Sequence, residues 1–200
     1  MNDKAIYKEH KLKDGHILQI FQDTWAESPR SWDNLGTMAI FHTRYNFGDE
    51  VNFSSDDFGG WVQMKEHIEN NLKAGVCIPI YLYDHGGIAI NTEGFACPWD
   101  SGQVGYIYVT EAKLKEEYNV SELTQELLDK AKNTLEEEVK IMNRYIMGDV
   151  YGFQLVIKES EKEEKIIDSC SGFYGEDIEK NGMLQHIPDK LLPENLTQKL

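Results

Sequence analysis

The sequence predicts an α+β protein of a single domain, with a mainly antiparallel sheet, one long amphipathic helix and one shorter helix. Two hundred residues, 40% of them hydrophobic, suit one domain with a sizeable core. Apolar residues recur at helical spacing over about 121–147, and shorter segments alternate between Gly and Asp turns as antiparallel strands do. We expect the domain to span residues 1–186. Residues 187–200, with two prolines and little periodicity, are expected to form a peripheral C-terminal tail.

The first third of the chain predicts strands followed by the shorter helix. Residues 5–23 alternate in polarity around Asp14-Gly15, which is a strong hairpin signal. Residues 37–42 form a short apolar run and are expected to be a buried strand. Apolar side chains at helical spacing after the Gly59-Gly60 pair predict a helix over about 61–74.

The middle of the chain predicts three more strands and a short helix. Residues 76–83 are the most apolar stretch and suggest a central strand, although Pro79 favours an edge or a bulge there. A turn at 84–87 leads to a strand over 88–91, and 104–109 predict another. Thr110 is a suitable cap for a helix over 111–118.

The long helix, expected at about 121–147, is predicted by one apolar stripe, with Ser121 as N-cap and Gly148 as the stop. The stripe consists of Leu123, Leu127, Leu128, Ala131, Leu135, Val139, Met142 and Ile146. Residues 150–158 and 165–170 then predict a hairpin across a charged turn at 159–164.

The charge balance limits the classes of partner. Thirty-five acidic and twenty basic residues give a formal net charge of −15, which repels nucleic acid and anionic lipid. We therefore expect no direct DNA binding and no membrane association, whereas a basic protein partner remains open. No apolar run approaches the roughly 20 residues that span a bilayer. Three cysteines without zinc-type spacing indicate reduced thiols, and we expect a cytoplasmic protein.

Aromatic residues gather in four segments rich in Gly, Asp and Ser, at 28–38, 42–49, 97–106 and 168–175. We expect these segments to be ordered loops, which are common places for binding surfaces. The candidate ligand- or partner-binding residues in them are Arg30, Trp32, Asp33, Arg44, Tyr45, Trp99 and Asp100. Arginine with aromatics fits both a nucleotide site and a protein–protein hot spot. The alternative is an aromatic cluster that stabilises long loops, with each arginine paired to a neighbouring Asp33 or Asp49.

Catalytic and metal-binding patterns are weak, and the sequence predicts no catalytic residue, metal or cofactor. Cys97 precedes a proline in a loop, where His42 or His85 could activate it, but a thiol packed against Trp99 is the simpler interpretation. His42, Asp84, His85 and Asp100 are metal-ligand types without an organising spacing. The segment 84–87 is equally natural as a hairpin turn.

Five strings carry a resemblance: Ser-Pro-Arg-Ser-Trp-Asp-Asn-Leu-Gly-Thr-Met (28–38), Phe-His-Thr-Arg-Tyr-Asn-Phe-Gly-Asp (41–49), Pro-Ile-Tyr-Leu-Tyr-Asp-His-Gly-Gly (79–87), Cys-Pro-Trp-Asp-Ser-Gly-Gln-Val-Gly-Tyr-Ile-Tyr-Val (97–109) and Gly-Asp-Val-Tyr-Gly-Phe (148–153). The chain resembles an uncharacterised family of small acidic proteins encoded by bacteriophages and other mobile genetic elements. The resemblance covers most of 28–175 and brings no activity or catalytic residue with it. It implies an accessory protein in the host cytoplasm that counters a host defence system.

Three functions are carried forward. The first is a binding protein that blocks a basic, nucleic-acid-handling host protein, because complementary fields speed encounter and favour the correct partner. The second is a nucleotide-signal sponge or small-molecule-binding protein that uses Arg30, Arg44 and the loop aromatics. The third is a hydrolase that uses Cys97 or a His/Asp metal site.

Overall fold

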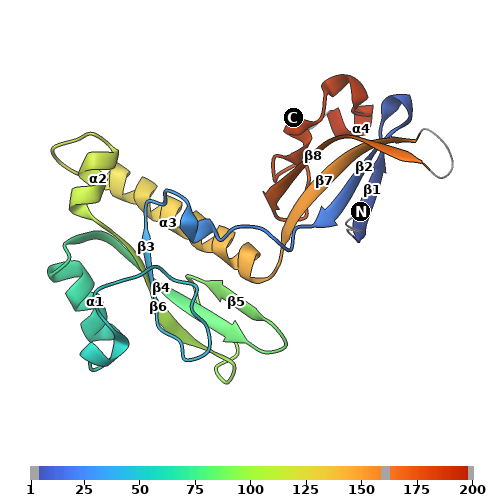
Figure 1. Cartoon of the computed structure of the whole chain (residues 1–200). Coiled ribbons are helices and arrows are strands. Elements are labelled where there is room, and N and C mark those ends of the chain that lie inside the picture. Colours follow the sequence, from blue (N-terminus) through green and yellow to red (C-terminus); the bar gives the residue numbers. More distant parts are fainter. Residues whose placement is uncertain (1–4, 159–162, 198–200) are drawn as a thin grey trace. The chain divides into compact units, whose positions relative to one another are not determined.

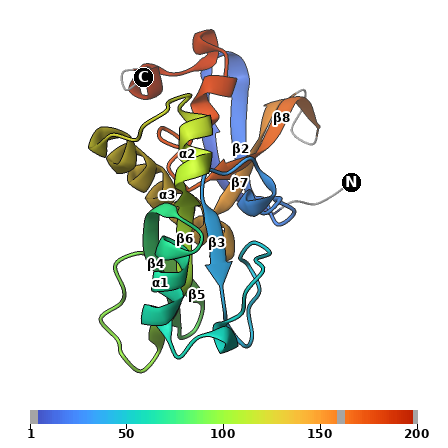
Figure 2. The ribbon, with the colours of Figure 1, turned by 90° about the vertical axis from the view of Figure 1, so that its left-hand side faces the viewer.

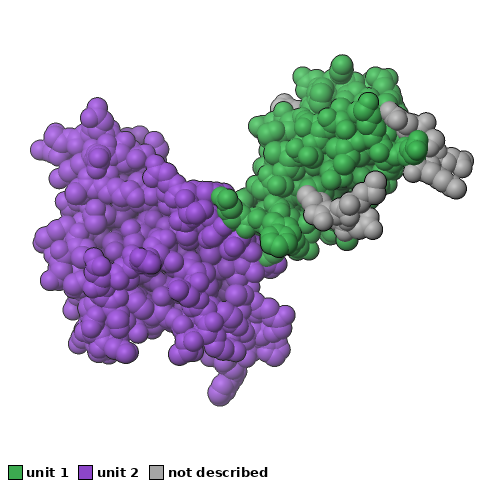
Figure 3. Space-filling model, viewed as in Figure 1, with its two compact units in different colours: residues 1–27, 148–200 green, residues 28–147 purple. Residues whose placement is uncertain are grey.

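The computed structural model describes residues 5–158 and 163–197 of the chain. Helices are combined with antiparallel strands, which confirms the predicted α+β class (Figure 1). Within this fold the chain forms two compact units, coloured separately in Figure 3. Unit 1 holds residues 1–27 and 148–200, and unit 2 holds residues 28–147. The division arises because strands from the two ends of the chain pair with each other and leave the middle of the chain with its own sheet.

Unit 1 is built on two hairpins that share one sheet, in the order β1-β2-β7-β8. The strands are β1 (Ile6–Lys11), β2 (His16–Gln22), β7 (Val150–Lys158) and β8 (Glu164–Tyr174). The predicted hairpin around Asp14 is confirmed, and Asp14 takes the left-handed conformation that such a turn needs, with φ 54°. The second hairpin is also confirmed, but residues 159–162 of its expected turn lie outside the described residues.

The described part of the C-terminal segment completes the core of unit 1. Residues 187–200 are expected to be peripheral, yet Ile187, Leu191 and Leu192 are buried against the sheet side chains Leu18 and Phe153. Ile178, Met183 and Leu184, which also follow β8, belong to the same cluster. The apolar residues between the two prolines therefore act as core residues even though they show no helical or strand period.

Unit 2 has a second four-stranded antiparallel sheet, in the order β3-β6-β4-β5. The strands are β3 (Thr37–Ile40), β4 (Ala74–Asp84), β5 (Ile88–Asn91) and β6 (Ser101–Thr110). The most apolar stretch is thus the interior strand β4, as predicted. Pro79 is tolerated because β5 pairs only with Tyr81–Asp84, so β4 has no β5 neighbour at the proline.

Helices cover both faces of the unit 2 sheet (Figures 1 and 2). Alternate residues of β6 face opposite ways, as a strand requires. Ile107 and Val109 pack against α3 (Gln125–Ile146), whereas Tyr106 and Tyr108 belong to the cluster that includes Met64 of α1 (Trp61–Asn70). A short helix, α2 (Glu111–Glu117), follows β6 with Thr110 as its N-cap, as predicted.

Several predicted boundaries differ from the structure. The helix α1 ends at Asn70, and Lys73, with φ 55°, leads the chain directly into β4. The long helix begins at Gln125, because the Thr124 hydroxyl caps it in place of Ser121. The segment 168–175, expected to be a loop, lies almost entirely in β8. Its Gly and Ser residues mark an exposed edge strand instead of a turn.

Candidate functional site

Two carboxylates meet where β4 ends and β6 begins. The β4–β6 ladder ends with Tyr83 opposite Ser101, and the backbone N–H of Asp84 donates to the Asp100 carbonyl at 2.8 Å, one step further along. Residues opposite each other in an antiparallel pair point to the same face, and like charges in that arrangement destabilise a sheet. The two aspartates therefore create a local demand for positive charge.

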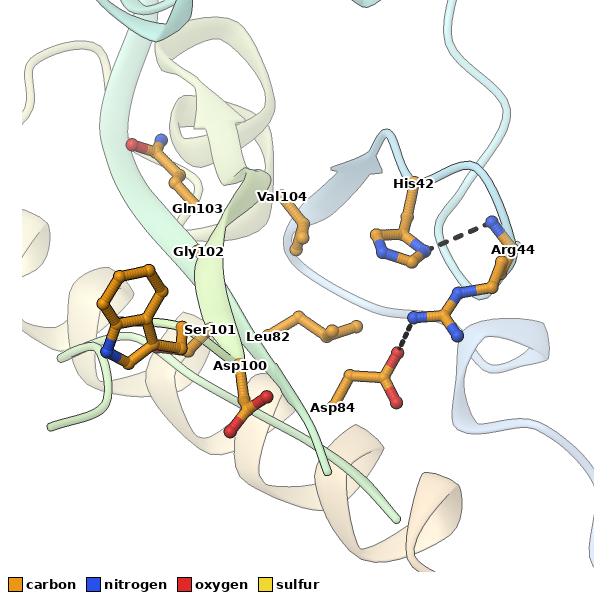
Figure 4. Close-up of a pocket in the computed structure, with 10 residues that line it drawn as sticks. His42, Arg44, Leu82, Asp84, Asp100, Ser101, Gly102, Gln103 and Val104 are labelled. Atoms are coloured by element: carbon orange, nitrogen blue, oxygen red, sulfur yellow. Dashed lines mark hydrogen bonds and ion pairs between the residues drawn. The ribbon is translucent and has the colours of Figure 1, made fainter. Parts of the chain in front are cut away.

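Arg44 supplies a positive charge at Asp84. It lies in the loop after β3 and forms an ion pair and hydrogen bond with the Asp84 carboxylate, toward which it points in Figure 4. The Tyr45 hydroxyl donates to the same carboxylate oxygen at 3.2 Å. The Arg44 guanidinium also lies 5.4 Å from the centre of the Tyr45 ring, a cation–π distance.

The loop that carries Arg44 is ordered by its own aromatic residues. His42 stacks on Tyr45 with ring centroids 5.0 Å apart and an interplanar angle of 11°. The His42 Nδ1 atom accepts a hydrogen bond from the Arg44 backbone N–H at 3.3 Å (Figure 4). This local network presents the arginine to β4 without fixing it in the interior.

Asp100 is surrounded by the turn after β4 and by its own loop. His85 Nδ1 lies 3.4 Å from Asp100 Oδ2. The Cys97 thiol donates to the same oxygen at 3.3 Å, and the Ser101 hydroxyl donates to the Cys97 carbonyl at 2.5 Å. The loop 97–101 is therefore closed on itself, with Trp99 at its tip.

A cavity of about 380 Å³ opens between these loops. Its walls come from the loop after β3, the end of β4 and the start of β6, and they include His42, Arg44, Asp84, Trp99 and Asp100. Such a volume lies within the usual range for ligand pockets, roughly 300–1,000 Å³. Trp99 contributes to the rim and remains 92% exposed, whereas most large apolar residues of unit 2 are covered.

Four of the seven predicted site residues thus belong to one place. Arg44, Trp99 and Asp100 line the cavity, and Tyr45 holds the Asp84 carboxylate in its wall. The sequence offers Asp84, His42 and His85 as metal-ligand types, and the two histidines also as activators of Cys97. The sequence signal for Asp84 is a polar residue directly after a buried strand, but its pairing with Asp100 depends on the strand register.

Arg30, Trp32 and Asp33 do not line this cavity. The Arg30 side chain is only 8% exposed and donates to both carboxylate oxygens of Asp49, at 3.0 and 2.5 Å. It also donates to Glu138 of α3 at 2.9 Å and to the Gly36 carbonyl at 2.7 Å. Arg30 is therefore a buried residue that anchors its loop. It pairs with Asp49, as in the alternative in which the loop arginines stabilise the loops instead of binding a ligand.

The arrangement does not support catalysis by Cys97 in this geometry. A Cys–His pair needs the imidazole within hydrogen-bond reach of the sulfur. Here the Cys97 thiol contacts the Asp100 carboxylate, and His85 contacts that same oxygen. Within residues 5–158 and 163–197, no group of three or more His, Cys, Asp or Glu side chains is arranged to hold a metal ion.

No protein-family model matches this chain, and searches of curated proteins and of solved structures give no match. Among the described helices, none combines the length and the apolar character that crossing a bilayer requires.

Proposed function

We propose that the protein is a binding protein that docks onto a protein partner through the rim of the unit 2 cavity. One observation carries this proposal: Trp99 is 92% exposed at the tip of a loop that Cys97, Asp100 and Ser101 hold closed. An ordered loop that displays a tryptophan to solvent is typical of a binding anchor, since Trp is among the residues enriched at hot spots.

The chemistry of the rim favours a basic partner. Asp84 and Asp100 lie beside the exposed tryptophan, and the whole chain carries a net charge of −15. Complementary fields raise association rates and suppress wrong partners. The resemblance to phage-encoded acidic proteins adds the context: we propose that the partner is a nucleic-acid-handling host protein, blocked as a means of countering host defence in the host cytoplasm.

The site supports the two other functions less well. A nucleotide would place phosphates next to Asp84 and Asp100, and Arg44, the nearest cation, is already paired with Asp84. A Cys–His hydrolase would need an imidazole beside the Cys97 sulfur, where the structure has the Asp100 carboxylate, which His85 also contacts.

Site-specific photo-crosslinking tests the proposal. A benzoylphenylalanine placed at Trp99 in the full chain should give one dominant protein adduct after illumination in a lysate of host cells. The matched control is the same group at Val62, which is 73% exposed on α1 of the same unit and does not line the cavity. The absence of an adduct from position 99, or equal adducts from both positions, would contradict the proposal.

Salt provides a second readout of the same adduct. If opposed charges steer the complex, the yield at position 99 should fall several-fold between low and physiological ionic strength. A yield insensitive to salt would show that the acidic surface plays no part in recognition.

A further inference from the structure

The ion pair inside the cavity is asymmetric in its exposure. The Arg44 side chain is 65% exposed, whereas the Asp84 side chain is only 20% exposed. The carboxylate is thus a fixed part of the wall, formed by the end of β4 and also bonded by Tyr45. The guanidinium reaches it from the solvent side, on a loop that Figure 4 shows at the opposite edge of the site.

In the cavity wall, the ion-pair partners of the Asp84 and Asp100 carboxylates are exposed side chains. Asp100 lies opposite Asp84 and contacts His85, whose side chain is 71% exposed, at 3.4 Å. Exposed ion pairs contribute little to stability, because solvent screens them and the long side chain loses freedom. The Arg44 and His85 side chains can therefore move away at small cost, while the paired strands hold the backbones of Asp84 and Asp100 next to each other.

We propose that the cavity receives an arginine or lysine side chain of the partner, and that Arg44 holds its place until the partner displaces it. This inference rests on the proposed function and names the group that the partner supplies. The incoming cation pairs with Asp84 and Asp100 together, which relieves the repulsion between them. A guanidinium is the better fit, since its planar fork donates to two carboxylates at once.

Trp99 adds to the selection of a cation. It lies on the rim of the same cavity, and an indole face attracts guanidinium and ammonium groups. An anion gains nothing from this rim and is repelled by the wall. The two kinds of site predict opposite effects of removing Arg44. The affinity of a nucleotide site would fall, whereas the affinity of a cation site would rise because Arg44 no longer competes for Asp84.

The test is a nuclear magnetic resonance titration of the full chain with acetyl-arginine amide, followed through the Trp99 indole signal, which a Trp99→Phe variant assigns. The inference predicts saturable shifts with acetyl-arginine amide, weaker binding of acetyl-lysine amide, and no binding of the neutral isostere acetyl-citrulline amide or of ATP. In Arg44→Ala the Kd for acetyl-arginine amide should fall at least threefold, and in Asp100→Asn it should rise by a similar factor.

A matched control separates displacement from bulk charge. Lys65→Ala removes one exposed cation that pairs with Glu69 on α1, away from the cavity lining, so the net charge changes as in Arg44→Ala. Its Kd should equal that of the wild type. An unchanged or higher Kd in Arg44→Ala, equal binding of the citrulline probe, or tighter binding of ATP would overturn the inference.

The two proposals can fail separately. An adduct at position 99 without binding of acetyl-arginine amide would leave the docking surface in place and overturn the cation pocket. Binding of the arginine probe that tightens in Arg44→Ala, without any adduct at position 99, would support the cation pocket and contradict docking of a protein through Trp99.

Discussion

Arg30 and Glu138 are separated by 108 residues in sequence and form an ion pair at 2.9 Å in unit 2. Glu138 also accepts the backbone N–H of Leu35 at 2.8 Å, so the pair fastens the loop before β3 to α3. Both side chains are largely buried, at 8% and 11% exposure. The loop arginine thus acts like a core residue.

Removal of Arg30 should destabilise unit 2 strongly. Arg30→Ala leaves Asp49 and Glu138 without their shared cation, and breaking a buried ion pair in this way costs about 3–5 kcal/mol. Arg44→Ala is the matched control, because its exposed pair should cost less than about 1 kcal/mol. Urea denaturation followed by circular dichroism measures both. Equal losses in the two variants would show that Arg30 is not an anchor.

Gly105 is expected to resist any side chain. A Cβ atom at this position of β6 would lie 1.9 Å from the carbonyl oxygen of Ala39 on β3. The two backbones would have to separate, so Gly105→Ala should lower the stability of unit 2 by at least about 3 kcal/mol, the upper end for overpacking. Gly102→Ala, where nothing lies within 4 Å, is the control in the same strand. A Gly105→Ala protein as stable as Gly102→Ala would contradict the close approach.

Cys77 should be nearly inert toward thiol reagents in the folded protein. Burial, with a smaller contribution from the charge of Glu69, raises the pKa of the Cys77 thiol to about 12. At pH 8 only about one molecule in 10⁴ then carries the reactive thiolate. Iodoacetamide labelling mapped by mass spectrometry should modify Cys77 slowly at pH 8 and faster as the pH rises towards 10. In urea the labelling at pH 8 should become fast, and rapid labelling without denaturant would be inconsistent with a buried thiol.

His10 should make unit 1 less stable in mild acid. Burial, with the nearby charge of Lys8, lowers the pKa of His10 below its usual 6.5, and no hydrogen-bond partner of its buried Nε2 atom is found among the described residues. As the pH falls through 6.5, His10 therefore binds a proton in the unfolded chain but stays neutral in the folded chain. Stability that is complete above pH 6.5 is therefore lost as the pH falls towards the lower folded value. The loss between pH 7 and pH 5 should be smaller in His10→Phe, as pH-dependent urea denaturation will show, and an identical loss would exclude His10 as a cause.

Local patterns in the sequence predict the elements well, because their causes are local. The apolar stripe of α3, the hairpin turn at Asp14 and the Thr110 cap each depend on residues within a few positions of one another. The division into two units depends instead on the pairing of β2 with β7, where Leu18 lies opposite Leu155. The residues of either strand do not specify which strand it pairs with, so local sequence patterns do not predict the two units.

The site residues also differ in whether local sequence patterns predict their placement. Composition groups Arg44 with Trp99 and Asp100, and all three line one cavity, because polar and aromatic residues in neighbouring loops of one sheet tend to meet at its edge. Composition cannot separate Arg44 from Arg30, since both lie in aromatic loops. They differ in burial: the Arg44 side chain is 65% exposed and pairs with Asp84 in the cavity wall, whereas the Arg30 side chain is 8% exposed and pairs with Asp49 and with Glu138 of α3.

The most direct test of the binding surface compares two exposed tryptophans. Trp99 and Trp25 are 92% and 88% exposed, so neither substitution by alanine should unfold the chain. With the partner recovered through position 99, Trp99→Ala should raise its Kd at least tenfold by calorimetry, which corresponds to about 1.4 kcal/mol. Trp25→Ala, a change in unit 1, should leave the Kd unchanged. Equal effects of the two substitutions, or no effect of Trp99→Ala, would contradict docking through the rim of the unit 2 cavity.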